Sequence, residues 1–283
     1  MSTISIGSLP AIDVHAHVGV CVDDNAQTGQ FMTGDGERVA QLAARAGTEI
    51  TVVSALRALM PPDGYDALRG NEEARRAVEA SAHLRLWAVL EPRLPESYRQ
   101  VERLLAHPLC VGIKIHPEMH GYAIAEHGRE IFAFAARHGA VVQTHSGDAR
   151  SLSLDFVPFA DEHHEVTLIL SHLGFGDRGD LTRQVRAIQM SRSGNIYTDT
   201  SSMRSLVPRL IEWAVAEVGA ERILYGTDSP LYFAPMQRAR IDHAEMPDQA
   251  KRLILRENAE RVLRLGVPPM KSIGARKAAS AGL

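Results

Sequence analysis

Short apolar runs alternate along this chain with longer amphipathic stretches. Runs of strand length separated by stretches of helical periodicity are typical of βαβ units, in which the strands are parallel. Eight such repeats favour a closed barrel over an open sheet, so we predict an α/β protein with a single (β/α)8 TIM barrel. The eight predicted strands are AIDVHAHV from Ala11, TEITVVSAL from Thr48, LRLWAVLEP from Leu84, CVGIKIHP from Cys110, AVVQTHSG from Ala140, VTLILSHLG from Val166, NIYTDTSS from Asn195 and RILYGTDSP from Arg222.

The connecting segments carry their own signals. Residues 124–138 place Ile131 and Phe134 on one helical face, and Gly139 is expected to end that helix. Residues 20–36 are polar and glycine-rich without periodicity, which predicts an extended loop after the first strand. We assign residues 1–266 to the barrel and 267–283 to a weakly ordered tail of small and polar residues.

Composition limits the classes of function. With 45% hydrophobic residues, 23% charged residues and a net charge of -3, the chain lacks the basic face that nucleic-acid binding requires. No apolar run approaches the about 18 residues of a membrane helix, and the N-terminus has no signal-peptide pattern, so we expect a cytoplasmic protein without a membrane partner. Cys21 and Cys110 form neither a CxxC pair nor a disulfide framework.

Polar residues recur where the predicted strands end. Alternation along the first strand puts Asp13, His15 and His17 on one face, where two imidazoles can bind one ion. An isolated histidine pair is more often structural, but the carboxyl ends of barrel strands are where such enzymes keep their catalytic groups. Three further strands end in histidine or aspartate: His145, His172 and Asp228.

These residue types form a ligand set for a divalent ion. We predict one ion, most readily Zn²⁺ with Mn²⁺ or Fe²⁺ as alternatives, bound by His15, His17, His145 and Asp228 with a position left open. Asp228 would also accept a proton as catalytic base, and His172 would donate a hydrogen bond to the substrate. His120 follows the fourth strand and is expected on a surface loop.

The order and spacing of these residues resemble the amidohydrolase superfamily. The GTDSP run from Thr227, the SHLG run from Ser171 and the ENAER run from Glu257 are similar to its amidohydrolase-2 branch, and the resemblance extends from Ala11 to Leu265. It implies a metal-activated water or a metal-bound substrate, with Asp228 beside it. That branch holds hydrolases, non-oxidative decarboxylases, lactonases and hydratases, so the reaction stays open.

The predicted reaction is hydrolysis of a small carboxylate-bearing ester, lactone or amide. The related decarboxylases tend to be longer and richer in aromatic residues, whereas aromatic residues make up 5% of this chain. Decarboxylation by a metal-dependent lyase of the same superfamily is the alternative. A non-catalytic barrel is a third reading, disfavoured by the complete ligand set, and a homo-oligomer is left open.

Lys114 and His116 share a face of the fourth strand and are predicted to bind a negatively charged group of the substrate. Two alternatives remain for Lys114: a structural ion pair with Asp13, or carboxylation to bridge a second metal. A nuclease of the TatD type also begins with HxH, but it has a glutamate where this chain has Lys114 and His116. Glu91 and Asp199 are weaker candidates that could hydrogen-bond a ligand histidine.

Overall fold

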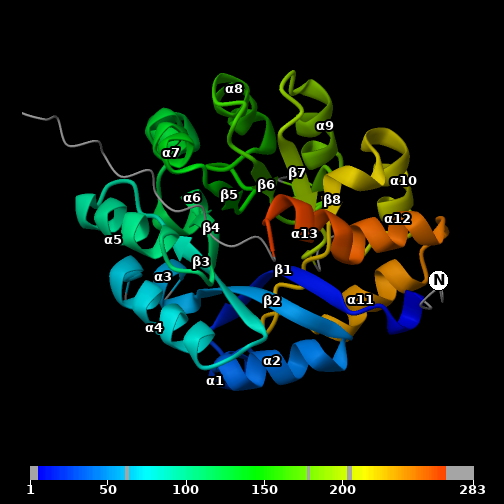
Figure 1. Cartoon of the computed structure of the whole chain (residues 1–283), viewed down its shortest axis with the longest axis horizontal. Helices are drawn as coiled ribbons and strands as arrows, with labels where there is room; N and C mark the ends of the chain where they lie inside the picture. Colours follow the sequence, from blue (N-terminus) through cyan, green and yellow to red (C-terminus); the bar gives the residue numbers. More distant parts are fainter. Residues whose placement is uncertain (1–5, 61–63, 177–178, 203–205, 266–283) are drawn as a thin grey trace, which may run out of the picture.

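The computed structural model describes residues 6–60, 64–176, 179–202 and 206–265, so the predicted tail lies outside the described segments. Eight parallel strands lie in chain order in one sheet, with the helices around its outside (Figure 1). The predicted (β/α)8 barrel is therefore confirmed. The strands are β1 (Ala11–Val18), β2 (Thr48–Ala55), β3 (Leu84–Val89), β4 (Cys110–Ile115), β5 (Val141–Thr144), β6 (Leu168–Leu170), β7 (Ile196–Asp199) and β8 (Ile223–Leu224).

Thirteen α-helices lie in the described segments, together with shorter helical turns. They are α1 (Ala26–Phe31), α2 (Gly36–Arg45), α3 (Leu56–Leu59), α4 (Ala67–Glu79), α5 (Pro95–Leu105), α6 (Pro117–His120), α7 (Ile124–His138), α8 (Val157–Glu162), α9 (Arg183–Met190), α10 (Leu210–Val218), α11 (Ala234–Asp242), α12 (Asp248–Arg252) and α13 (Asn258–Val262). A π-helical turn over Leu253–Glu257 joins α12 to α13.

Local sequence explains where several helices begin and end. The carboxylate of Asp35 accepts a hydrogen bond from the backbone N–H of Arg38 and caps α2. Gly139 ends α7 in the left-handed conformation, with φ of 58°, as predicted. The extended loop predicted for residues 20–36 is wrong over α1, whose first turn is stabilised by the Asn25 side chain accepting from two backbone N–H groups.

Hydrogen bonds between β1 and the segment that follows β8 bring the two ends of the sheet together. Ala16 and Ser229 form a parallel bridge, and the backbone N–H of Asp228 donates to the carbonyl of His15 at 2.7 Å. A second bond runs from the N–H of Val14 to the carbonyl of Tyr225 at 2.9 Å. The first and last strands are thus held in fixed register at the carboxyl end of the barrel.

The barrel interior is filled by side chains rather than open. Trp87 is fully buried there among inward-facing apolar residues of the other strands, and its indole N–H donates to the carbonyl of Val14 at 2.8 Å. Ala259 and Val262 of α13 pack against the same cluster, so this helix covers one end of the barrel, as Figure 1 shows. The open end is therefore the one at which the strands finish.

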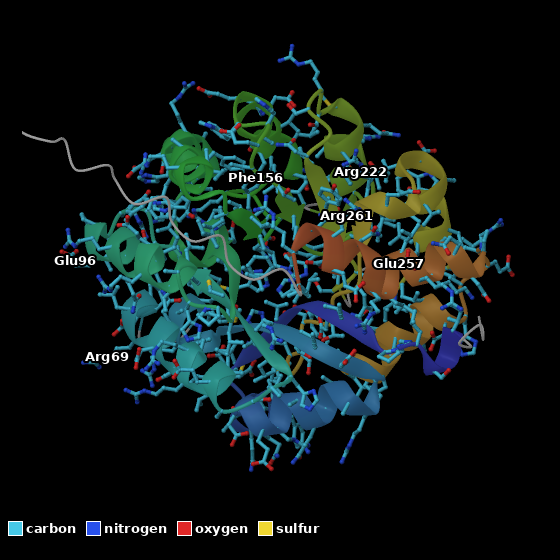
Figure 2. All side chains as sticks on the ribbon, viewed as in Figure 1. Arg69, Glu96, Phe156, Arg222, Glu257 and Arg261 are labelled. Carbon is cyan, nitrogen blue, oxygen red and sulfur yellow. The ribbon has the colours of Figure 1, made fainter. Side chains whose placement is uncertain are left out.

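The helices bury their apolar faces against the outside of the strands in a continuous core. Charged side chains occupy the opposite faces: Arg69 of α4 and Glu96 of α5 project outward from the rim of the molecule (Figure 2). Among the helices of the described segments, none combines the length and the hydrophobicity needed to cross a bilayer.

The tight contact between Trp87 and β4 predicts the effect of a single methyl group. A Cβ at Gly112 would lie 2.7 Å from the Trp87 ring and would also collide with the carbonyl of Val141. We expect Gly112→Ala to lower the free energy of unfolding by about 1–3 kcal/mol, measured by urea denaturation. Gly7→Ala is the matched control, because a Cβ there meets no atom within 4 Å; equal stability of the two variants would contradict this account.

Candidate metal and substrate site

A cavity of about 210 Å³ lies at the carboxyl ends of the strands. Every residue proposed from the sequence for metal binding, catalysis or substrate binding lines it: His15, His17, Lys114, His116, His145, His172 and Asp228. Apolar and polar neighbours complete the wall: Met60, Met119, Asp148, Phe175, Ser202, Leu231 and Tyr232. The fold therefore brings these residues from the ends of five separate strands to one small cavity.

An irregularity in β1 aims its two histidines into this cavity. The pairing of β1 with β2 shifts register between Asp13 and Ala16. Val14 consequently packs in the barrel interior while the next residue, His15, lines the cavity. The prediction that Asp13 shares the face of His15 is wrong: the Asp13 carboxylate accepts hydrogen bonds from the backbone N–H of His15 and from the N–H and hydroxyl of Thr227.

Three side chains from β1 and the end of β8 form a compact group of metal donors. The Asp228 Oδ1 atom lies 2.9 Å from His17 Nε2 and 3.4 Å from His15 Nε2. One donor atom from each of the three lies within 4.8 Å of the others, and all three residues are buried. Burial acts to raise the pKa of Asp228, but His15 and His17 hold it well below its usual range. Two imidazoles and a carboxylate in this arrangement fit a divalent ion.

His145 reaches the cavity but is not part of that compact group. Its Nε2 atom lies 2.7 Å from the Asp148 carboxylate, and its Nδ1 atom lies 3.1 Å from His172 Nε2. The ring also stacks on His116 with centroids 4.3 Å apart. Both nitrogens of His145 thus make contacts other than those expected of the proposed fourth metal ligand.

Lys114 places a buried cation beside the donor group. Its Nζ atom lies 3.2 Å from His15 Nε2 and donates to Gln143 Oε1 at 3.2 Å. Burial lowers the pKa of Lys114 to about 8. Asp13 is occupied by Thr227, so the alternative of a Lys114–Asp13 ion pair is not observed.

His116 shares the cavity wall with Lys114, as the alternation in β4 predicts. Its Nδ1 atom accepts the backbone N–H of Met119 at 3.2 Å and so caps α6. Burial and the neighbouring His145 hold the pKa of His116 well below its ordinary value, which favours a neutral ring. One ring nitrogen of His116 is therefore held by the backbone, while the side of the ring that lines the cavity is available to a ligand.

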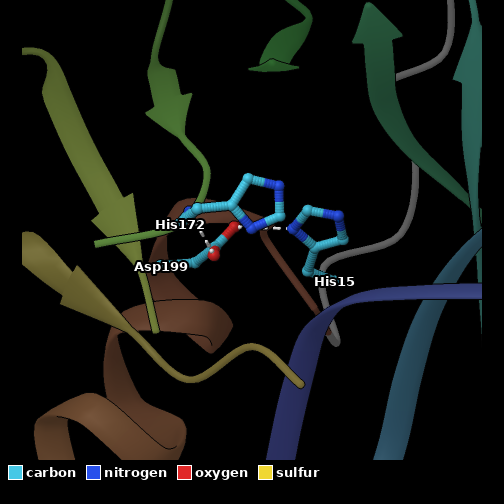
Figure 3. A group of neighbouring side chains, drawn as sticks. All are labelled: His15, His172 and Asp199. Carbon is cyan, nitrogen blue, oxygen red and sulfur yellow. Dashed lines mark hydrogen bonds and ion pairs between the residues drawn. The ribbon is translucent and has the colours of Figure 1, made fainter. Parts of the chain in front are cut away.

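Asp199 is only a weak candidate from the sequence, and Ser201 is not a candidate at all. Asp199 is fully buried at the end of β7, and its Oδ2 atom lies 3.1 Å from His15 Nδ1. Figure 3 shows its carboxylate between His15 and His172, whose backbone N–H donates to Oδ1 at 3.1 Å. His15, His172 and Asp199 form a second compact group of donors, but the Ser201 hydroxyl lies within 3.0 Å of all three side chains. This second group is therefore a hydrogen-bonded network.

Two other residues considered from the sequence lie outside the cavity lining. Glu91 accepts hydrogen bonds from the backbone and side chain of Arg93 and from the Tyr65 hydroxyl, which fits the structural alternative of a turn cap. The prediction of a surface loop for His120 is wrong: the residue is buried, and its ring stacks on Tyr65 while Nε2 lies 2.9 Å from the carbonyl of Ala58.

Comparison with known proteins gives both a family and a set of similar folds. The family model described as amidohydrolase matches residues 12–265. A 5-carboxyvanillate decarboxylase from Novosphingobium aromaticivorans, solved with bound manganese and 3-methoxy-4-hydroxy-5-nitrobenzoic acid, superposes with a TM-score of 0.70 at 14% identity, covering 90% of this chain and 97% of that chain. A dihydroxybenzoic acid decarboxylase from Polaromonas sp. JS666, with manganese and the inhibitor 2-nitroresorcinol, gives 0.68 at 16%, covering 90% and 97%.

A putative amidohydrolase from Staphylococcus aureus gives a TM-score of 0.67 at 15% identity, covering 91% of this chain and 100% of that chain. No curated protein matches the sequence. At these identities the solved structures support the barrel fold, whereas the family model spans nearly the whole chain. The chain therefore belongs to the amidohydrolase family, in its amidohydrolase-2 branch.

Proposed function

We propose that this chain is a metal-dependent enzyme that removes carbon dioxide, without oxidation, from a small carboxylic acid. The observation that carries the proposal is the buried Lys114 ammonium 3.2 Å from His15, beside the donor group of His15, His17 and Asp228. A cation next to an ion site forms a two-point attraction for a carboxylate. Decarboxylase activity in two similar folds with bound manganese supports the same reaction.

The cavity size and lining support a small substrate. About 210 Å³ is below the roughly 300–1,000 Å³ of pockets for drug-sized ligands. The polar groups gather around Lys114 and the donor group, and Phe175 and Leu231 add apolar surface that can contact the body of the substrate. We therefore expect one carboxylate and a compact apolar remainder.

In the proposed reaction the C–C bond to the carboxylate breaks, carbon dioxide leaves, and the electron pair on carbon takes a proton. His15, His17 and Asp228, with His145 as proposed fourth ligand, would hold a divalent ion, whose Lewis acidity would stabilise the developing negative charge. His172 faces the same cavity, and burial holds its pKa well below the ordinary value. The ring is therefore neutral and can take up a proton and pass it on, which suits a group that transfers the proton to carbon.

Hydrolysis of a carboxylate-bearing ester, lactone or amide is the second proposal. Asp228 favours it, because this carboxylate lies in the cavity wall beside both β1 histidines and can accept a proton from water. In that case His172 would donate a hydrogen bond to the substrate oxygen, which requires a proton on its Nε2 atom. For either reaction we propose a cytoplasmic enzyme that acts on a small molecule, with Mn²⁺ or Zn²⁺ as the ion.

Metal content tests the ligand assignment. We expect about one divalent ion per chain after loading with Mn²⁺ or Zn²⁺, measured by elemental analysis, and little in the double variant His15→Ala, His17→Ala. His164→Ala is the matched control, because that side chain is 78% exposed. Full metal content in the double variant would show that the site is misassigned, and unchanged affinity in His145→Ala would remove His145 from the ligand set.

Product analysis distinguishes the two reactions. We expect release of carbon dioxide from one member of a panel of small aromatic and aliphatic acids, each incubated with the metal-loaded protein. Asp228→Asn should abolish turnover, and His172→Asn should lower kcat on the order of 100-fold with metal still bound, because a proton-transfer group is lost. Cleavage of an ester, lactone or amide without release of carbon dioxide would contradict decarboxylation and establish hydrolysis.

The role of Lys114 is tested by substrate affinity. If the ammonium binds the carboxylate, Lys114→Met should raise KM for the acidic substrate by about tenfold or more while metal content stays the same. Lys251→Met is the control, because Lys251 donates to the carbonyl of Asp242 outside the cavity lining. A fall in metal content or extra mass on Lys114 would instead support carboxylation, and a loss of thermal stability with unchanged kinetics would assign a structural role.

A further inference from the structure

We propose that Ser201 is a positioning residue that fixes which nitrogen of His15 and of His172 carries a proton. In each neutral ring the Nε2 atom is then unprotonated: that of His15 lies beside Lys114 and Asp228, and that of His172 lies 3.1 Å from Nδ1 of His145. This inference rests on the proposed function, in which His15 binds the ion and His172 transfers the proton. Ser201 itself is fully buried behind the cavity wall and does not line it.

The first step concerns the hydroxyl proton of Ser201. Its Oγ atom lies 2.5 Å from Asp199 Oδ1, and an ionised carboxylate can only accept hydrogen bonds. Asp199 is held in the ionised form by donors around it: the backbone N–H groups of His172 and Ser201 both lie 3.1 Å from Oδ1. The single hydroxyl proton of Ser201 is therefore donated to Asp199.

The second step follows from this hydrogen bond to Asp199. With its only proton used, Ser201 Oγ can interact with its other neighbours only as an acceptor. Those neighbours are Nδ1 of His15 at 3.0 Å and Nδ1 of His172 at 2.8 Å. Both imidazoles must therefore carry a proton on Nδ1, and in a neutral ring Nε2 is left with a lone pair.

An independent contact agrees with this assignment for His15. Lys114 Nζ lies 3.2 Å from His15 Nε2, and an ammonium group can only donate. The contacts of His15 with Ser201 and with Lys114 thus both indicate that its Nε2 atom is an acceptor. It is also the nitrogen nearest Asp228, at 3.4 Å, and so the one in position to bind an ion.

The two histidines do not depend on Ser201 equally. Nδ1 of His15 has a second acceptor in Asp199 Oδ2 at 3.1 Å, which remains if the hydroxyl is removed. For Nδ1 of His172, the hydroxyl of Ser201 is the hydrogen-bond partner recorded in the described part of the chain. Without the hydroxyl, the proton of His172 should no longer be restricted to Nδ1, whereas the proton of His15 should stay on Nδ1.

The experiment compares Ser201→Ala with two other serine variants. Ser201→Thr keeps the hydroxyl and should restore function, and thermal unfolding shows whether its added methyl group is tolerated. Ser171→Ala is the matched control: this buried serine lies at the end of β6, and its hydroxyl has no hydrogen-bond partner among the described residues. We expect kcat to fall about 10–100-fold in Ser201→Ala only, with metal affinity nearly unchanged.

A spectroscopic readout separates positioning from stability. Nitrogen-15 spectra of the imidazoles, recorded on the zinc-loaded protein, should show His172 protonated at Nδ1 in the wild type and as a mixture of tautomers in Ser201→Ala. His172→Gln identifies the signal. An unchanged His172 tautomer in Ser201→Ala, or an equal loss of kcat in Ser171→Ala, would overturn the proposal. A Ser201-dependent tautomer in a protein that turns over no acid, ester, lactone or amide would uphold the positioning and refute the proposed function.

Discussion

The contact between β1 and the segment that follows β8 is the one on which the site depends. It is short, with one parallel bridge between Ala16 and Ser229 and a few backbone hydrogen bonds around it. His15 and His17 stand on one side of this seam and Asp228 on the other, so the donor group spans the closure of the barrel. An ion bound there would connect the first strand to the last, which couples metal binding to the integrity of the fold.

Several polar side chains are buried around this seam. Asp199 offsets the cost of its own burial by accepting hydrogen bonds from backbone and side-chain donors, including Gln143 at 3.2 Å. Networks of this kind stabilise one arrangement of their members because each unsatisfied group would be costly in a low-dielectric interior. The histidine rings are therefore oriented before any ligand arrives, which reduces the reorganisation that binding requires.

The sequence predicted the fold and seven of the residues that line the cavity because both follow from periodicity. Apolar runs mark buried parallel strands, and polar residues at their ends must meet at one rim. The register shift in β1 was not predictable, since alternation alone assigns Asp13 to the face of His15. Alternation in β7 did point to Asp199 and continues to Ser201, but the contact between their side chains and those of β1 depends on barrel closure.

The position of the donor group in the chain has a consequence for biosynthesis. His15 and His17 emerge from the ribosome before Asp228, which follows His17 by 211 residues. A growing chain thus contains the HxH pair without its carboxylate partner while those 211 residues are made, at about 5–20 residues per second. The complete ligand set therefore exists only once the last strand has been made and the barrel has formed. The geometry of the folded site, rather than the HxH pair alone, would then select the ion.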